Sequence, residues 1–381
     1  MLMGQKRKII KASTVPVSLN VFCRDQLREL SQHYEVVAVS SPGEDLDEVA
    51  RREGVKTVSV SMQRHIEPMS DLVSLMRLIA CFRREKPWMV HSMTPKAGLL
   101  CMMAAWVARV PRRVHTFTGL VWPTQHGAKR LLLKTMDRLL CACATHIIPE
   151  GQGVKRDIEN GRITSKPMRV LANGNVRGID LEHYSLTPRI KAEAERLRRA
   201  DKLTFVFVGR LVADKGINEL VEAFDIVSRN RNDVRLVLVG GQETKLDPLT
   251  DKTLDIIETN ENIVAVGQQS DVRPWLAAAD VFVFPSYREG FPNVVIEAGA
   301  MGLPSIVTDI NGSNEIVIVD QNGLIVPPRQ VEPLVQAMTV LADDGEMRQA
   351  MASRARKMVA DRYDCNLVRQ ALYEFYATIG D

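Results

Sequence analysis

The chain has 381 residues, of which 45% are hydrophobic and 25% charged, and its formal net charge is +4. Domains usually hold about 100–200 residues, so this length predicts two, and the ordinary composition excludes a disordered chain. The small net charge excludes a protein that binds polyanions through overall charge alone, so the positions of the basic residues matter more than their number.

Targeting and redox features favour a cytoplasmic protein. The six cysteines are scattered, and the close pair Cys141 and Cys143 lacks the spacing of a zinc or thioredoxin-type site. Residues 1–11 contain no apolar core of a signal peptide. The longest apolar run, residues 97–108, is shorter than the roughly 18–20 residues that span a bilayer. We therefore expect a protein that at most rests on a membrane surface.

Short β-branched runs alternate with amphipathic segments along the chain, which predicts parallel sheets covered by helices on both faces. The second half repeats the pattern of the first, so the fold class is α/β with two doubly wound domains. The predicted strands are residues 36–39, 57–60, 89–90, 113–116, 146–148, 203–208, 234–239, 263–266, 281–284 and 305–307.

Loops at the carboxyl ends of strands are the expected binding positions, because open α/β sheets bind ligands there. Residues 14–18 lie where the first strand ends, so Thr14 and Ser18 are candidate contacts. His115 ends a later strand. Two such sheets facing each other would leave a cleft between the domains, and we expect the substrates to bind in it.

A basic segment follows in the first domain. Residues 109–138 hold seven basic residues against one acidic residue, Asp137, a local excess larger than the net charge of the whole chain. Residues 128–140 predict an amphipathic helix with a basic and an apolar face. Either this helix docks on anionic lipid, or its apolar residues pack into the core while its cations stay in solvent. The apolar residues concerned are Leu132, Met136, Leu139 and Leu140.

The domain boundary is predicted at residues 173–180, where Gly and Asn punctuate the chain ahead of a charged helix. The second domain then opens with a strand that ends in Gly209, a residue that lets a ligand approach the backbone. Arg210 and Lys215 follow in the next loop. Arg binds phosphate oxygens in bidentate fashion and Lys acts as a compact charge, so the pair predicts a diphosphate ligand. Two solvated loop cations are the alternative interpretation.

A second motif, Glu-Gly-Phe-Pro-Asn at residues 289–293, follows the strand at 281–284. It leads into a helix whose free N–H groups can bind an anion. Glu289 precedes this helix and Glu297 lies within it, so the two carboxylates should contact different parts of one elongated ligand. A polar, glycine-containing loop within residues 302–315 also matches a ligand-facing position.

The order of these motifs, with Gly-Leu-Pro at residues 302–304, resembles the GT4 family of retaining glycosyltransferases over nearly the whole chain. The resemblance implies the GT-B fold, two Rossmann-like domains facing across a cleft. Residues 1–176 would bind the acceptor and residues 177–362 the nucleotide-sugar donor. A C-terminal helix, about residues 363–381, would cross back to the first domain.

The resemblance also implies roles for the motif residues. Arg210 and Lys215 would hold the donor diphosphate and stabilise the charge that develops as it leaves. Glu289 would accept hydrogen bonds from the transferred sugar, and Glu297 from the ribose. The leaving phosphate would take the acceptor proton, so neither a protein base nor a metal or other cofactor is implied. The other implied contacts are Gly209, Gly290, Phe291, Pro292 and Asn293.

The first domain is similar to a narrower branch that extends capsular and lipid-linked sugars. This branch implies a polyprenyl-diphosphate-linked saccharide acceptor at the cytoplasmic face of the membrane, with Lys96 joining Thr14 and Ser18 as candidate contacts. In the family a residue near this position contacts the donor sugar, so His115 is a candidate substrate contact. Because the family often has that residue slightly later, where Phe117 and Thr118 stand, a structural role for His115 is the alternative. The matching segments are residues 91–98, 113–119, 136–138 and 148–154.

The donor expected from the branch is a UDP-linked hexose or N-acetylhexosamine, with GDP left open. An epimerase of the same fold that hydrolyses nucleotide sugars would need an acid–base pair, which the sequence does not offer. A non-catalytic sugar-nucleotide binding protein would have lost the cations at Arg210 and Lys215. A Rossmann dehydrogenase is disfavoured, because no G-x-G-x-x-G follows the first strand.

Overall fold

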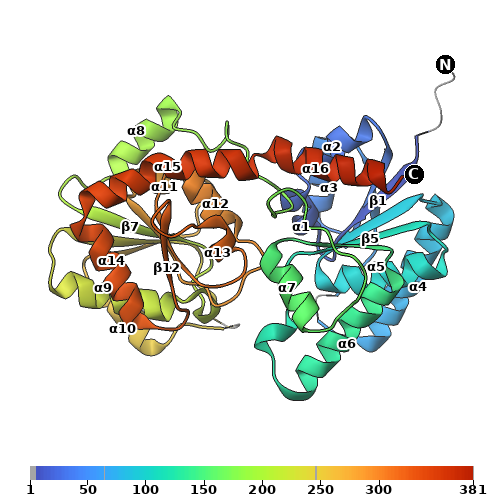
Figure 1. Ribbon diagram of the computed structural model, residues 1–381, viewed down its shortest axis with the longest axis horizontal. Helices are drawn as coiled ribbons and strands as arrows, with labels where there is room; N and C mark the ends of the chain where they lie inside the picture. Colours follow the sequence, from blue (N-terminus) through green and yellow to red (C-terminus); the bar gives the residue numbers. More distant parts are fainter. Residues whose placement is uncertain (1–5, 64, 245–246, 381) are drawn as a thin grey trace. The chain divides into compact units, whose positions relative to one another are not determined.

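The computed structural model describes residues 6–63, 65–244 and 247–380, and its chain divides into two compact units (Figure 1). The first unit holds the chain up to Gly178 together with the segment from Asn366 onward. The second unit is Ile179–Cys365. The sequence predicts a first domain of residues 1–176 joined by a C-terminal helix of about residues 363–381, and a second domain of residues 177–362.

The first unit contains a parallel sheet of six strands in the order β3-β2-β1-β4-β5-β6. Strand β4 is buried along its whole length, as expected for a parallel sheet covered on both faces. The strand order reverses between β1 and β4, so the chain moves outward on either side of this pair. The strands are β1 (Lys8–Ala12), β2 (Glu35–Ser40), β3 (Lys56–Ser59), β4 (Met89–Met93), β5 (Arg112–Phe117) and β6 (His146–Pro149).

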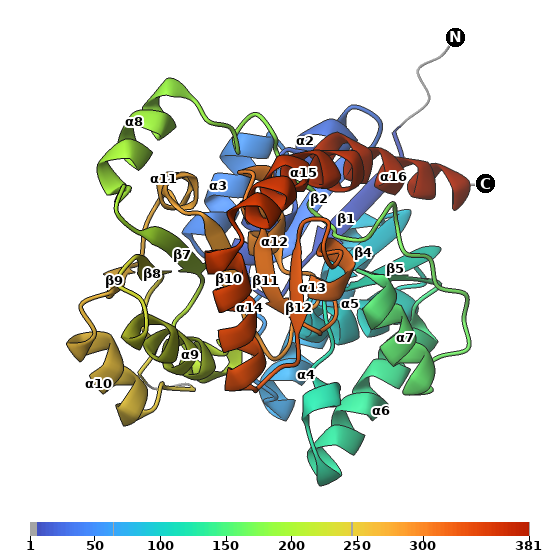
Figure 2. The same ribbon diagram turned by 60° about the vertical axis from the view of Figure 1, so that its left-hand side comes forward.

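Helices cover both faces of this sheet. Helices α4 (Pro68–Glu85), α5 (Pro95–Val107) and α6 (Gly127–Cys143) lie side by side, with α5 in contact with both neighbours (Figures 1 and 2). The apolar run at residues 97–108 forms most of α5 and is largely buried. None of the described helices is long and apolar enough to cross a bilayer. The other elements are α1 (Pro16–Phe22), α2 (Gln26–Ser31), α3 (Glu44–Glu53), the 3₁₀ turn η1 (Trp122–Thr124) and α7 (Gln152–Asn160).

The last helix, α16 (Cys365–Thr378), completes the core of the first unit. Its residues Leu372, Phe375 and Tyr376 are buried with apolar residues of β1, β2 and β4. The Tyr376 hydroxyl is hydrogen-bonded to Nδ1 of His91 on β4 (2.5 Å), and His91 Nε2 is bonded to Thr116 on β5 (2.7 Å). The C-terminal segment is therefore an integral part of the first unit.

The second unit contains another parallel sheet, in the order β12-β11-β10-β7-β8-β9. Its strand order reverses between β7 and β10. The strands are β7 (Leu203–Val208), β8 (Val234–Val239), β9 (Ile263–Gly267), β10 (Val281–Phe284), β11 (Ser305–Thr308) and β12 (Gly323–Val326). The predicted α/β class with two doubly wound sheets is confirmed. Strand β1 is the first strand expected ahead of residue 14, and β12 is an addition to the predicted strands.

Helices also cover this second sheet, and short connections join them to the strands (Figure 2). They are α8 (Pro188–Leu197), the 3₁₀ turn η2 (Ala213–Lys215), α9 (Ile217–Arg229), α10 (Asp251–Thr259), α11 (Arg273–Ala278), α12 (Asn293–Ala300), α13 (Ser313–Ile316), α14 (Val331–Asp343) and α15 (Gly345–Tyr363).

Close packing of α5 on β5 makes Gly98 a test of the first core. A methyl group at Gly98 would overlap Cε1 of His115 and lie 2.7 Å from Cδ1 of Leu140. Overpacking of this kind costs about 1–3 kcal/mol, so Gly98→Ala should lower the free energy of unfolding by about that amount in urea titrations. The control is Gly345→Ala at the start of α15, where the added methyl meets nothing closer than 3.6 Å. Equal stabilities of the two variants would contradict this packing.

Candidate active site

The second unit brings charged side chains together where its strand order reverses, the position at which open α/β sheets bind ligands. Lys215 follows β7 and Glu289 follows β10, and the Lys215 ammonium forms an ion pair with Glu289 Oε1. The two side chains are only 18% and 17% exposed. The Ser286 hydroxyl donates a second hydrogen bond to the same Oε1 atom (2.8 Å). The reversal therefore holds a compact, half-buried cluster of Lys215, Ser286 and Glu289.

The backbone of Gly216 allows these two loops to approach. Its φ is +72°, and a Cβ atom at this position would overlap the carbonyl oxygen of Pro285. Beside this contact, the Tyr287 amide donates a hydrogen bond to the carbonyl oxygen of Asp214 (2.9 Å). Glycine is the residue that fits both the left-handed backbone and the close contact. The ion pair thus depends on a loop geometry that only glycine supports without strain.

Ser286 and Thr308 belong to this site but were not predicted from the sequence. Thr308 ends β11, is buried, and donates its hydroxyl hydrogen to the carbonyl oxygen of Ser286. Both residues stand at the carboxyl ends of neighbouring buried strands. A search for polar residues immediately after buried apolar runs would have found them.

The other predicted donor contacts differ in accessibility. Arg210 is exposed just beyond β7, and Gly209 before it is half-buried. Gly290 is half-buried next to Glu289. Phe291 is buried and its ring packs edge-on against Tyr363 at a centroid distance of 5.5 Å.

The Pro292 side chain is also buried, so both Phe291 and Pro292 can offer a substrate only backbone atoms. Helix α12 begins at Asn293, directly after Pro292. Glu297 lies in α12 one turn after Asn293, and both residues are half-buried. Glu289 and Glu297 therefore stand on different elements, a loop and a helix, as the motif predicts.

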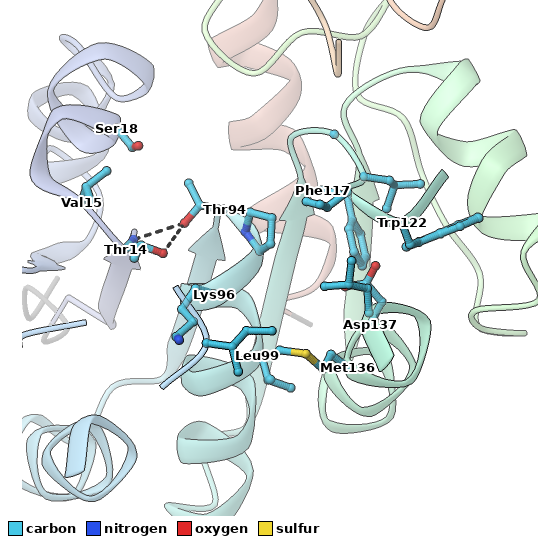
Figure 3. A pocket seen from close by; sticks show the side chains of 16 residues that line it. Thr14, Val15, Ser18, Thr94, Lys96, Leu99, Phe117, Trp122, Met136 and Asp137 are labelled. Atoms are coloured by element: carbon cyan, nitrogen blue, oxygen red, sulfur yellow. Dashed lines mark hydrogen bonds between the residues drawn. The ribbon is translucent and has the colours of Figure 1, made fainter. Parts of the chain in front are cut away.

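The first unit has a cavity of about 320 Å³ at its own strand reversal, and Thr14, Ser18 and Lys96 all line it (Figure 3). The Thr14 and Thr94 hydroxyls are hydrogen-bonded (2.9 Å), which joins the segments after β1 and β4. The Lys96 ammonium lies 2.7 Å from the Asp71 carboxylate of α4. The structure thus brings together the three residues that the sequence proposed as acceptor contacts.

Ser18 occupies a different element from the one predicted. The sequence placed it in a loop, but Pro16 starts α1, so Ser18 lies in the first turn of that helix. Proline favours the first helical position because its fixed φ suits the helix and its missing N–H is not needed there.

The opposite wall of the cavity is apolar apart from one carboxyl group (Figure 3). Trp122 is buried in it, and the cationic groups of Arg130 and Lys134 lie 5.7 and 5.1 Å from the centre of its ring. Burial raises the pKa of Asp137 to about 7, against an opposing effect of the Trp122 indole N–H. From the sequence, Asp137 stands out only as the single acidic residue of the basic segment at residues 109–138.

His115 is placed inside the first unit and not at a ligand-facing surface. Its side chain is 1% exposed, its Nδ1 is bonded to the Ser92 hydroxyl (2.9 Å), and Gly98 packs on it. Its Nε2 has no hydrogen-bond partner among the described residues. Burial lowers the pKa of His115 to about 3. The geometry therefore supports the structural histidine and not the predicted substrate contact.

The arrangement of His, Cys, Asp and Glu side chains bears on metal and disulfide chemistry. Within residues 6–63, 65–244 and 247–380, no group of three or more His, Cys, Asp or Glu side chains is placed to hold a metal ion. All six cysteines are free, and Cys141 and Cys143 are buried.

Solved structures define the fold class. The chain superposes on HepE of Anabaena in complex with UDP with a TM-score of 0.82 at 17% identity, covering 97% of this chain and 100% of the other. It also superposes on sucrose-phosphate synthase of Thermosynechococcus elongatus with a TM-score of 0.79 at 19% identity, covering 98% and 99%. Two Rossmann-like units of this type are the GT-B fold of glycosyltransferases.

Sequence relatives define the family. A model described as glycosyl transferase 4-like domain matches residues 19–174, and one described as glycosyl transferases group 1 matches residues 189–358. The chain is 31% identical over 380 residues, 98% of each chain, to the capsular polysaccharide biosynthesis glycosyltransferase CapM of Staphylococcus aureus. It is 28% identical, over 81% of this chain and 79% of the relative, to the UDP-Gal:alpha-D-GlcNAc-diphosphoundecaprenol alpha-1,3-galactosyltransferase of Escherichia coli. The chain belongs to the GT4 family and is a glycosyltransferase.

The raised pKa of Asp137 predicts a pH-dependent stability. An exposed Asp titrates near 3.9, so between about pH 4 and 7 this carboxyl binds more protons in the folded protein than in the unfolded chain. The contribution of Asp137 to the free energy of unfolding should therefore fall as the pH rises through this range, whereas the lowered pKa of His115 gives a contribution of the opposite slope. Asp137→Asn should increase stability at about pH 8 and have little effect at about pH 4, as measured by urea unfolding.

The matched control is Asp255→Asn, at an exposed position of α10. Its effect on stability should be small and equal at the two pH values. A stability difference between wild type and Asp137→Asn that does not change with pH would contradict the raised pKa of Asp137.

Proposed function

We propose that this glycosyltransferase transfers a hexose or N-acetylhexosamine from a UDP-sugar to a polyprenyl-diphosphate-linked saccharide, with retention and without a metal ion. The cluster of Lys215, Ser286 and Glu289 at the strand reversal carries the proposal. The E. coli relative supports the donor and acceptor classes, since its name states UDP-Gal and a diphosphoundecaprenol acceptor. The name of CapM supports a place in capsular polysaccharide synthesis. The enzyme would act at the cytoplasmic face of the membrane, where a polyprenyl-linked acceptor is held.

The ion pair leaves both partners able to bind donor. An ammonium group has three N–H donors, so Lys215 can contact Glu289 and a phosphate oxygen together. Oε1 of Glu289 accepts both hydrogen bonds that this side chain makes with the described residues, which leaves Oε2 for a sugar hydroxyl. Glu289 thus holds the Lys215 ammonium in place and also presents an acceptor to the sugar.

Charge stabilisation is then the main contribution of the protein to the reaction. Lys215 and the exposed Arg210 would neutralise the leaving diphosphate, and Glu297 would bind the ribose hydroxyls. The leaving phosphate oxygen would take the acceptor proton, so no side chain has to act as a base. The nucleotide sugar is a co-substrate, and no cofactor is required.

The cavity of the first unit is the proposed acceptor site. Thr14, Ser18 and Lys96 supply hydroxyl and ammonium groups on one side, as a sugar diphosphate requires, and the remaining wall is mainly apolar. A non-catalytic nucleotide-sugar binding protein is not favoured, because the paired Lys215 and Glu289 are both present.

The donor assignment predicts the effect of two substitutions. Lys215→Ala and Glu289→Gln should each lower kcat by about 10²–10³, because they remove preorganised charge from the reacting diphosphate and sugar. UDP release from a panel of UDP- and GDP-sugars measures the effect, and thermal unfolding checks the fold. Lys252→Ala breaks a comparable but exposed ion pair with Glu222 on the surface (2.9 Å) and should leave kcat unchanged. Wild-type turnover by Lys215→Ala or Glu289→Gln would refute the donor site.

The mechanism predicts the outcome of a chelator experiment and the stereochemistry of the product. Excess EDTA should leave turnover unchanged, because the cationic side chains replace a metal ion at the diphosphate. Proton NMR of the product should show the anomeric configuration of the donor sugar. Activity that EDTA abolishes and Mn²⁺ restores would overturn metal independence, and an inverted anomer would overturn retention.

A further inference from the structure

Helix α4 carries apolar side chains on its solvent face as well as on its core face. Leu78 and Phe82 pack into the core, whereas Met69, Leu72 and Met76 are 78%, 53% and 59% exposed. The exposed residues follow the three- and four-residue spacing of one helical stripe, which half-exposed Val73 completes. A second apolar stripe in solvent is not needed for folding, so it marks an interaction surface.

Helix α6 carries a similar exposed group. Leu131 is 62% exposed, and Leu132 and Leu139 are also exposed. Leu140 is buried, as the core-packing alternative from the sequence requires. That alternative is wrong for Leu132 and Leu139, which the first unit does not bury.

Residues close in the chain to both exposed groups line the acceptor cavity. Ile66, just before α4, lines the cavity and is itself 48% exposed. Leu133 and Met136 of α6 line the same cavity. The apolar wall of the cavity is therefore continuous with the apolar surface of the protein at Ile66.

Basic residues accompany this surface. Of the seven in residues 109–138, Arg112 and Arg113 hydrogen-bond backbone carbonyl oxygens near the start of β5. Lys129, Arg130 and Lys134, all on α6, stand next to the exposed leucines.

The acidic groups on these two elements are fewer or neutralised. Glu67 is exposed, Asp71 is paired with Lys96, Glu85 is buried in ion pairs with three basic residues, and burial raises the pKa of Asp137. Arg77 adds a further exposed cation on α4. The surface thus combines apolar side chains with a net positive charge, which complements an anionic lipid headgroup layer.

We propose that α4 and α6 form a docking surface for an anionic lipid bilayer, which places the mouth of the acceptor cavity at the membrane. The apolar stripe enters the acyl boundary, and the cations of α6 contact lipid phosphates. The lipid chain of the acceptor then reaches the cavity past Ile66 without crossing water. The last step rests on the proposed function, and the docking itself does not.

Vesicle flotation of the full chain tests the docking surface. Wild type should float with phosphatidylcholine vesicles containing phosphatidylglycerol and bind pure phosphatidylcholine more weakly. Leu72→Asp should reduce flotation about tenfold, because a charge replaces an inserted side chain. Leu367→Asp is the matched control, since Leu367 is 47% exposed on α16 of the same unit, and it should float like wild type. Lys129→Glu should weaken binding to the anionic vesicles only.

Activity provides the second measurement. Leu72→Asp should lose turnover on an acceptor embedded in vesicles and keep it on a short-chain, water-soluble analogue, which also shows that the variant is folded. Flotation of Leu72→Asp equal to wild type, or no flotation of wild type, would overturn the proposal. Failure of the proposed function has a different result, namely no turnover of any nucleotide sugar by a wild-type protein that still floats.

Discussion

The reversal of strand order determines where both candidate sites of this protein lie. In each sheet the first strand pairs with the fourth, β1 with β4 and β7 with β10, and the chain leaves the two strands in opposite directions. Because crossover connections are right-handed, the helices that follow such a pair cover opposite faces and leave the edge between them open. Thr14 and Lys96 follow one pair, and Lys215 and Glu289 follow the other.

In each unit a different interaction joins the two loops at the strand reversal. In the second unit the loops are joined by an ion pair in a half-buried position, where losing one partner leaves a poorly solvated charge. In the first unit the Thr14 and Thr94 hydroxyls join the loops instead, and most of the surrounding wall is apolar. A preorganised charge suits a diphosphate, whereas a neutral joint beside an apolar wall suits a ligand with a lipid chain. The proposed assignment of the donor to the second unit and of the acceptor to the first rests on this difference.

The sequence predicts this fold well, because short, β-branched, mostly apolar runs such as residues 203–208 and 234–239 are typical of buried strands. It misses β12, whose four residues begin with a glycine that packs against the Ser305 backbone. Topology predicted a ligand-facing position for Thr14 after the first strand, and the family resemblance added Lys96; both line one cavity with Ser18, which lies in α1 and not in the predicted loop. Side-chain accessibility was not predictable from the sequence. The burial of His115 depends on the crossing of α5 at Gly98, which is a tertiary contact without a local sequence signal.

Helix α6 shows why a description by two faces, one basic and one apolar, is not enough for this segment. Leu140 and Cys141 face the core, Leu133, Met136 and Asp137 line the cavity, and Leu131 and Leu139 are exposed. A helix that borders a cavity at the edge of a sheet has three environments, and a pattern of apolar and polar residues distinguishes only two. The carboxyl group of Asp137 illustrates the consequence. It would be costly as a charge in that wall, so it favours the protonated form there, and the ammonium group of Lys96 on the opposite side remains the charged group available to an anionic ligand.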